Sequence, residues 1–138
     1  MPTRYLLDTN ILSDLLKNPQ GKVARKISSL PSAERDSLAT SIIVAAELRY
    51  GVARSGSSIL AGRVEQLLDA LEILPFEPNA DRHYGQIRAE LEMAGTPIGA
   101  NDLLIAAQTL ALKIVLVTDN IREFKRVKNL QVENWLRS

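Results

Sequence analysis

The sequence has no cysteine and a single histidine, His83, among its 138 residues. Without cysteine, the chain forms no disulfide bond, no zinc–thiolate site and no cysteine nucleophile. With no second histidine, we expect His83 to be a surface residue in the first turn of a helix, not part of a catalytic triad or a histidine metal site. Any metal chemistry is then left to oxygen ligands.

The chain also lacks any apolar run long enough to cross a membrane, so we expect no membrane association. We expect no signal peptide, because residues 1–7 carry one arginine and lead directly into Asp8. These features favour a cytoplasmic protein. The glycine-containing segment 95–99 lacks the Lys-Ser/Thr pair of a phosphate-binding loop, which argues against a nucleotide site.

Size and charge leave several function classes open. A length of 138 residues with 46% hydrophobic residues predicts one globular domain. The net charge of +1 argues neither for nor against nucleic-acid binding. A basic cluster follows Asp119 and consists of Arg122, Lys125, Arg126 and Lys128. This cluster is either a solvated helix face or a cationic rim around an acidic centre, which a phosphate-cutting site needs because acids alone would repel its substrate.

Four acids stand beside apolar runs where predicted strands give way to helices. They are Asp8 after residues 5–7, Glu47 within 42–48, Asp102 before 103–107, and Asp119 after 114–118. Acids in apolar surroundings are normally neutralised, paired or bound to a metal. Since the available ligands are oxygens, the four acids point to a magnesium or manganese site.

Each acid also has a simpler interpretation. Asp8 could only cap the helix that follows it, and Glu47 could be half-buried and paired with an arginine. Asp102 could be a favourable acid in a first helical turn, with Asn101 as the cap, and Asp119 could be a turn residue.

Apolar periodicity, caps and turns predict alternating strands and helices. The predicted strands are 4–7, 37–40, 72–76, 114–117 and a last one near Val132; the predicted helices are 11–17 capped by Asn10, 22–29, 42 to about 52 capped by Ser41, 59–71, 81–94, 100–112, and a short basic helix after Asp119. This alternation indicates an α/β fold with a parallel sheet between helices. Ligands of such sheets bind outside the carboxyl ends of the strands, where the four acids would converge.

Five short motifs occur in order along the chain. They are Leu7-Asp8-Thr9-Asn10, 46–51 (AELRYG), 99–107 (GANDLLIAA), Val117-Thr118-Asp119-Asn120 with Glu123-Phe124, and 132–135 (VENW). In these motifs the chain resembles PIN-domain ribonuclease toxins of the VapC type, including their FitB-like relatives. The resemblance covers nearly the whole chain. It implies one PIN domain over residues 1–138, with a three-layer fold and a parallel sheet of about five strands.

The resemblance also implies an activity and roles for residues. Such proteins are Mg²⁺- or Mn²⁺-dependent endoribonucleases, several of which cut structured RNAs such as tRNA. Asp8, Glu47 and Asp102 correspond to the first three family acids, with Asp8 and Asp102 as direct metal ligands. Many relatives have the fourth acid where this chain has Asn120. Here Asp119, one place earlier, is the predicted fourth catalytic acid, with Glu123 as the alternative source of that charge. Supporting roles are expected for Asn10, Thr118, Asn120 and Glu123.

The resemblance further implies partners. We expect a VapB-like antitoxin that blocks the site with an arginine, binds DNA itself, and docks an apolar helix near Ile11, Leu12 and Leu15. We also expect a homodimer formed through the helices 59–71 and 81–94. Two other functions remain open: a PIN nuclease acting in RNA processing or on DNA, and a non-catalytic antitoxin-binding module.

Overall fold

A computed structural model describes residues 3–137, which fold around a sheet of five short strands. The strands are β1 (Tyr5–Leu7), β2 (Ala39–Ser41), β3 (Glu72–Leu74), β4 (Val115–Val117) and β5 (Val132–Glu133). Their spatial order is β3-β2-β1-β4-β5, and every neighbouring pair is parallel. The predicted α/β architecture with a parallel sheet is therefore confirmed.

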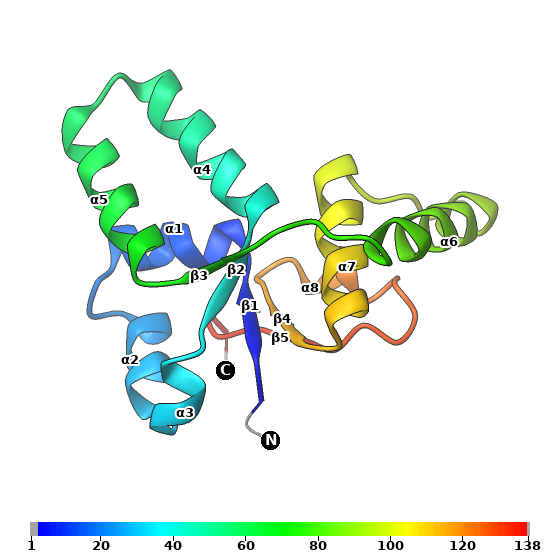
Figure 1. The fold of residues 1–138 in the computed structure, drawn as a ribbon, viewed down its shortest axis with the longest axis horizontal. Helices are drawn as coiled ribbons and strands as arrows, with labels where there is room; N and C mark the ends of the chain where they lie inside the picture. Colours follow the sequence, from blue (N-terminus) through cyan, green and yellow to red (C-terminus); the bar gives the residue numbers. More distant parts are fainter. Residues whose placement is uncertain (1–2, 138) are drawn as a thin grey trace.

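Eight helices flank this sheet in the described part of the chain. They are α1 (Thr9–Lys17), α2 (Lys22–Ser29), α3 (Ser32–Arg35), α4 (Ile42–Ser55), α5 (Ser58–Asp69), α6 (Ala80–Met93), α7 (Ala100–Leu112) and α8 (Ile121–Phe124). In Figure 1, α1 to α5 lie to one side of the strands and α6 to α8 to the other.

The two central strands are apolar because the sheet is covered on both faces. Leu6 and Leu7 of β1, and Leu116 and Val117 of β4, have no exposed surface. The middle of α7 is also fully buried, at residues 105–107. Polar residues that directly follow these aliphatic strands therefore lie at the edge of the sheet.

The helix starts show how local chemistry sets the boundaries. Ser41 caps α4 as predicted, accepting a hydrogen bond from the Ile43 backbone N–H at 2.9 Å. The prediction that Asn10 caps the first helix is wrong. Asp8 is the cap, its carboxylate accepts from the Thr9 backbone N–H, and α1 begins two residues earlier than expected.

Two further boundaries differ from the prediction. The short helix α3, with Pro31 at its N-cap position, was not among the predicted helices. The expected basic helix is the single turn α8, which contains only Arg122 of the four basic residues.

The helices α4 and α5 form a hairpin that extends away from the sheet (Figure 1). Gly56 ends α4 at a φ of 66°, a left-handed conformation that glycine adopts readily, and the Ser57 hydroxyl then caps α5. Within residues 3–137, no helix is long and apolar enough to cross a membrane.

Candidate functional site

The candidate site lies where the strand order reverses. From β1 the chain adds β2 and β3 on one side, then returns to add β4 and β5 on the other. Residues Leu7 and Val117 are partners in the register of β1 and β4, so the next residues, Asp8 and Thr118, leave the sheet side by side. Such a switch point at the carboxyl ends of the strands is the usual place for a ligand site in an open parallel sheet.

Asp8 is held on both carboxylate oxygens. Its Oδ1 accepts from the Thr9 backbone N–H at 2.8 Å, and its Oδ2 accepts from the Thr118 hydroxyl at 2.7 Å and from Asn10 Nδ2 at 3.4 Å. The side chain is only 4% exposed. Burial raises its pKa, the hydrogen bonds from Thr118 and Thr9 oppose that effect, and the charge of Glu47 adds to it.

Glu47 reaches this site from α4. Its Oε1 accepts a hydrogen bond from the Thr9 hydroxyl at 2.7 Å, so Thr9 contacts Glu47 through its side chain and Asp8 through its backbone. Glu47 forms no ion pair with an arginine within residues 3–137. Its charge is therefore not neutralised in the way that the simpler interpretation requires.

Asp102 comes from the first turn of α7, and Glu123 comes from α8. Asn120 Nδ2 donates to Asp102 Oδ2 at 3.2 Å and to Glu123 Oε2 at 3.3 Å. Burial raises the pKa of Asp102 to about 7, and the negative charge of Asp8, a hydrogen bond with Glu123, and the charges of Glu123 and Glu47 contribute further. The structure thus brings together Asp8, Glu47, Asp102 and Glu123, which we call the acid cluster.

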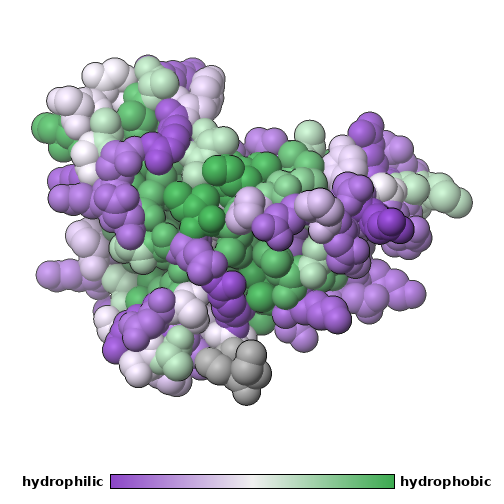
Figure 2. Space-filling model, viewed as in Figure 1, coloured by the Kyte–Doolittle hydropathy of each residue, from purple (hydrophilic) through white to green (hydrophobic). Residues whose placement is uncertain are grey.

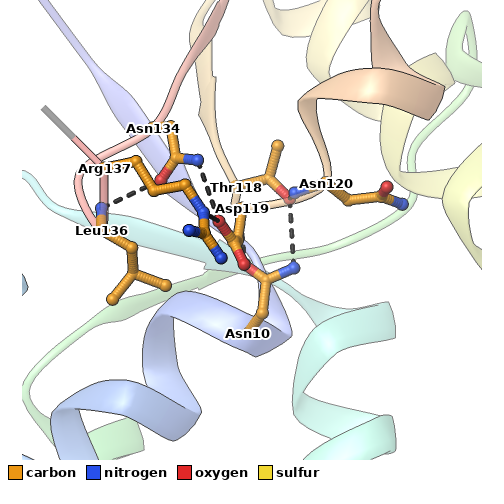
Figure 3. A network of polar contacts seen from close by, with 7 residues as sticks. All are labelled: Asn10, Thr118, Asp119, Asn120, Asn134, Leu136 and Arg137. Carbon is orange, nitrogen blue, oxygen red and sulfur yellow. Dashed lines mark hydrogen bonds and ion pairs between the residues drawn. The ribbon is translucent and has the colours of Figure 1, made fainter.

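Asp119 does not belong to the acid cluster, which corrects its predicted place as the fourth acid. Its Oδ1 accepts from Asn134 Nδ2 and from Arg137 Nε, both at 2.9 Å (Figure 3). These two contacts lower the pKa of Asp119, the opposite of the shift at Asp102. A residue directly after Thr118 points to the other side of the extended chain, and Glu123 takes the place in the cluster from the next helical turn.

The predicted supporting residues form a polar frame behind the cluster. Asn10 Nδ2 donates to Thr118 Oγ1 at 3.2 Å, and Asn10 Oδ1 accepts from the Asp119 backbone N–H at 2.9 Å (Figure 3). Thr118 Oγ1 also accepts from the Asn120 backbone N–H at 3.0 Å. This frame fixes the carboxylate of Asp8 and the amide of Asn120 relative to each other.

The chemistry of the donor set fits a hard divalent cation. All donors are oxygens, and their mutual repulsion is what a bound cation would relieve. The side chains are not arranged as a preformed metal site, however. Within the described residues, no group of three or more acidic or histidine side chains is placed so that it could already hold a metal ion.

The basic cluster after Asp119 is exposed, as either of its interpretations requires. Arg126 Nη1 donates to the Pro97 backbone carbonyl at 3.1 Å, so it also ties the end of α8 to the loop before α7. A role of Arg122, Lys125, Arg126 and Lys128 in RNA binding stays a prediction.

Sequence reasoning missed three contributors to the site. Thr9 was not singled out, although a hydroxyl beside the first acid is a common carboxylate partner. Asn134 and Arg137 were not connected to Asp119, because their contact joins the chain's last segment to β4 and carries no local signal. The polar residue at 134, placed directly after the last strand, was the one available hint.

Three comparisons with known proteins agree with this geometry. The model of the PIN domain family matches residues 5–130. Ribonuclease VapC2 from Rickettsia felis is 41% identical over 132 residues, covering 95% of this chain and 97% of the relative. The tRNA(fMet)-specific endonuclease VapC from Salmonella typhimurium is 34% identical over 133 residues, a match that covers 96% of this chain and 98% of the relative.

The fold is also similar to that of a solved complex. A crystal structure of VapBC2 from Rickettsia felis, bound to a DNA fragment from their promoter, contains a chain that superposes with a TM-score of 0.89 at 40% identity. The match covers 96% of this chain and 99% of the other.

Proposed function

The chain belongs to the PIN-domain family, in its VapC ribonuclease branch, and from this premise we propose that it is the endoribonuclease toxin of a type II toxin–antitoxin pair. The observation that carries the proposal is the acid cluster at the switch point between β1 and β4. A module that only binds an antitoxin is less favoured, because the similar proteins are named as a ribonuclease and an endonuclease. A role in RNA processing or on DNA is less favoured, because the similar proteins are named ribonucleases VapC.

The proposed reaction is hydrolysis of a phosphodiester bond with Mg²⁺ or Mn²⁺. Asp8 and Asp102 would hold the ion, with Glu47 and Glu123 nearby. When bound, the cation supplies positive charge for the phosphate oxygens and for the attacking water. It would also replace the proton that Asp102 carries near neutral pH.

This chain's own residues would position the reacting groups. Thr118 and Asn10 keep the Asp8 carboxylate fixed, and Asn120 holds Asp102 and Glu123 together. Because Asn120 keeps Glu123 beside Asp102, a carboxylate that does not hold the ion would lie where it could accept the proton of the attacking water. We propose tRNA as the substrate class, because a relative covering nearly the whole chain is a tRNA(fMet)-specific endonuclease. Such a toxin acts where cellular RNA is, so the proposed compartment is the cytoplasm.

The proposed partner is a VapB-like antitoxin. A groove of about 460 Å³ runs between α1, α4 and α5, with apolar walls from Leu16, Leu48, Val52, Leu60 and Val64. It reaches Thr9 and Glu47, so a helix seated there could carry an arginine to the acid cluster. The earlier expectation of docking at Ile11 and Leu12 is wrong, because both are completely buried in the core. DNA binding would belong to the antitoxin.

Inducible expression in a bacterial host tests the proposal. Newly formed RNA 5′ ends are mapped after induction, with Asp8→Ala expressed to the same level. The proposal predicts a small set of discrete new ends with the wild-type protein, none with Asp8→Ala, and none when the antitoxin is co-expressed. If both proteins give the same ends as uninduced cells, the chain is not a ribonuclease toxin.

A further inference from the structure

A second hollow shares no lining residue with the antitoxin groove. It is lined by residues of α2 and of the segment 133–137, and has a volume of about 600 Å³. Its cationic residues are Lys22, Arg25, Lys26 and Arg137, and Trp135 lies in its wall. We call it the basic hollow.

The helical spacing of α2 concentrates its charge on one face. Lys22, Arg25 and Lys26 are spaced at i, i+3 and i+4, so they share the exposed face of α2, while Val23 is completely buried on the other. None of these three cations forms an ion pair with any residue of 3–137. Arg137 pairs with Asp119, yet its side chain is 77% exposed.

The charge of the basic hollow is one-sided. Of its four cationic side chains only Arg137 is paired, with Asp119, and the lining holds a single carboxylate, Glu133, in a chain whose total net charge is only +1. Glu133 is itself engaged, since its Oε1 accepts from Trp135 Nε1 at 3.0 Å. The hollow therefore offers unpaired positive charge, which suits a polyanion.

The basic hollow is joined to the acid cluster by a continuous chain of hydrogen bonds. Asn134 and Arg137 bind the carboxylate of Asp119, whose backbone N–H donates to Asn10. Asn10 Nδ2 in turn donates to Asp8 Oδ2 at 3.4 Å. Asp119, which Asn134 and Arg137 of the hollow bind, is thus only two hydrogen bonds away from Asp8.

We infer that the basic hollow binds the phosphodiester backbone of the RNA substrate on one side of the bond that is cut. The inference rests on the proposed ribonuclease function and adds a substrate-binding site to it. An acid cluster alone repels RNA, and unpaired lysines and arginines beside it supply the attraction through release of counterions. An acidic protein segment is the less suitable occupant, because the hollow offers little apolar anchorage: Trp135 is only 7% exposed and packs edge-on against Tyr5.

Trp135 makes the inference testable, because it is the chain's single tryptophan and lies in the hollow's wall. A single-stranded RNA oligonucleotide is titrated into the purified protein in EDTA, so that it is not cut, and tryptophan emission is recorded at several salt concentrations. The test variant is Arg25→Ala/Lys26→Ala. The matched control is Arg54→Ala/Arg82→Ala, which removes two exposed arginines that lie on α4 and α6, outside the hollow.

The inference predicts that RNA changes the emission of the wild-type protein and of the control with the same Kd. The test variant should bind roughly tenfold more weakly at 0.1 M salt, and its plot of log K against log salt should be flatter by about 1.4, the value for two lost contacts to single-stranded phosphates. If misfolding shifts the emission of the free test variant, Lys22→Gln replaces it, with an expected flattening of about 0.7.

Two results would overturn the inference. One is a test variant that binds as the control does. The other is RNA that binds the wild-type protein without changing the emission of Trp135, while a bound antitoxin does change it, which would make the hollow a protein contact. Since the titration involves no cleavage, its failure leaves the proposed function standing, and a wild-type protein that does not cut RNA would fail the proposed function separately.

Discussion

Burial and neighbouring carboxylates bring the pKa of Asp102 close to neutral pH. Its pKa is about 7, against an ordinary value of 3.8, mainly because it is partly buried and faces Asp8 and Glu123. The folded protein therefore holds this proton more tightly than the unfolded chain does. The stabilisation that protonated Asp102 gives the fold is therefore fully present below pH 3.8 and is lost as the pH rises through about 7.

Asp102→Asn should accordingly abolish cleavage while making the fold more stable at high pH. Without divalent cations, we expect a gain of about 1 kcal/mol in the free energy of unfolding at pH 8, discounted for solvent screening, and almost none at pH 4. Urea unfolding of both proteins at the two pH values measures this difference. Destabilisation at pH 8 would mean that Asp102 has a structural role instead.

Glu123 and Asp119 are distinguished by what they contact. Glu123→Gln should lower the cleavage rate about tenfold or more, since Glu123 lies beside Asp102. Asp119→Asn should stay within about twofold of wild type, because Asp119 contacts Asn134 and a largely exposed Arg137, not the cluster. The test compares the cleavage rates of the two variants on one RNA substrate at saturating Mg²⁺. A larger loss of rate in Asp119→Asn than in Glu123→Gln would return Asp119 to the role of fourth acid.

At the scale of elements, the first turn of α1 has two tasks. Asp8 caps the helix and also supplies a carboxylate to the acid cluster. Asparagine caps helices about as well as aspartate, and alanine does not. Asp8→Ala should therefore be about 1 kcal/mol less stable than Asp8→Asn, although both are inactive. Thermal unfolding of the two variants measures the stabilisation from the helix cap, because both variants lack the negative charge. Equal stabilities would mean that the Asp8 side chain does not stabilise α1 as a cap.

The elements themselves were largely predictable because their signals are local. Runs of aliphatic residues predicted the positions of the strands, and apolar residues at helical spacing predicted α5, α6 and α7. Helix starts were harder, since Asp8 and Asn10 are both good caps and only the geometry after β1 selects Asp8. The short α3 carries too few residues for a periodic pattern.

The candidate site was predictable only in part, for a related reason. Asp8, Glu47 and Asp102 are each marked by apolar neighbours in the sequence. The choice between Asp119 and Glu123 depends on which side of the chain faces the sheet edge, and on two distant residues, Asn134 and Arg137, that bind Asp119. The charge of the basic hollow likewise arises from segments more than a hundred residues apart, α2 and residues 133–137.

For the whole molecule, exposed apolar residues support the prediction of a homodimer. Tyr50, Ile59 and Met93, on α4, α5 and α6, are 66%, 72% and 88% exposed. Separately, Figure 2 shows hydrophobic residues across the middle of the face that it draws. We expect sedimentation equilibrium at micromolar concentration to give twice the chain mass of 15.2 kDa.

Ile59→Glu should shift this dimer toward monomer. Ser58→Glu is the matched control, because it adds the same charge in the same first turn of α5, where the helix dipole tolerates an acid. Equal masses for the two variants would place the interface away from α5, and a monomeric wild-type protein would contradict the dimer itself.

The central claim is that the acid cluster at the switch point cuts RNA with the help of a divalent cation. The most direct test is a cleavage assay with the purified, antitoxin-free protein and a tRNA pool, over a Mg²⁺ series that starts in EDTA, with Asp102→Asn in parallel. The account predicts discrete products from the wild-type protein that appear only with the cation, and none from Asp102→Asn at any concentration. Equal cleavage in EDTA and in Mg²⁺, or by Asp102→Asn and the wild-type protein, would contradict it.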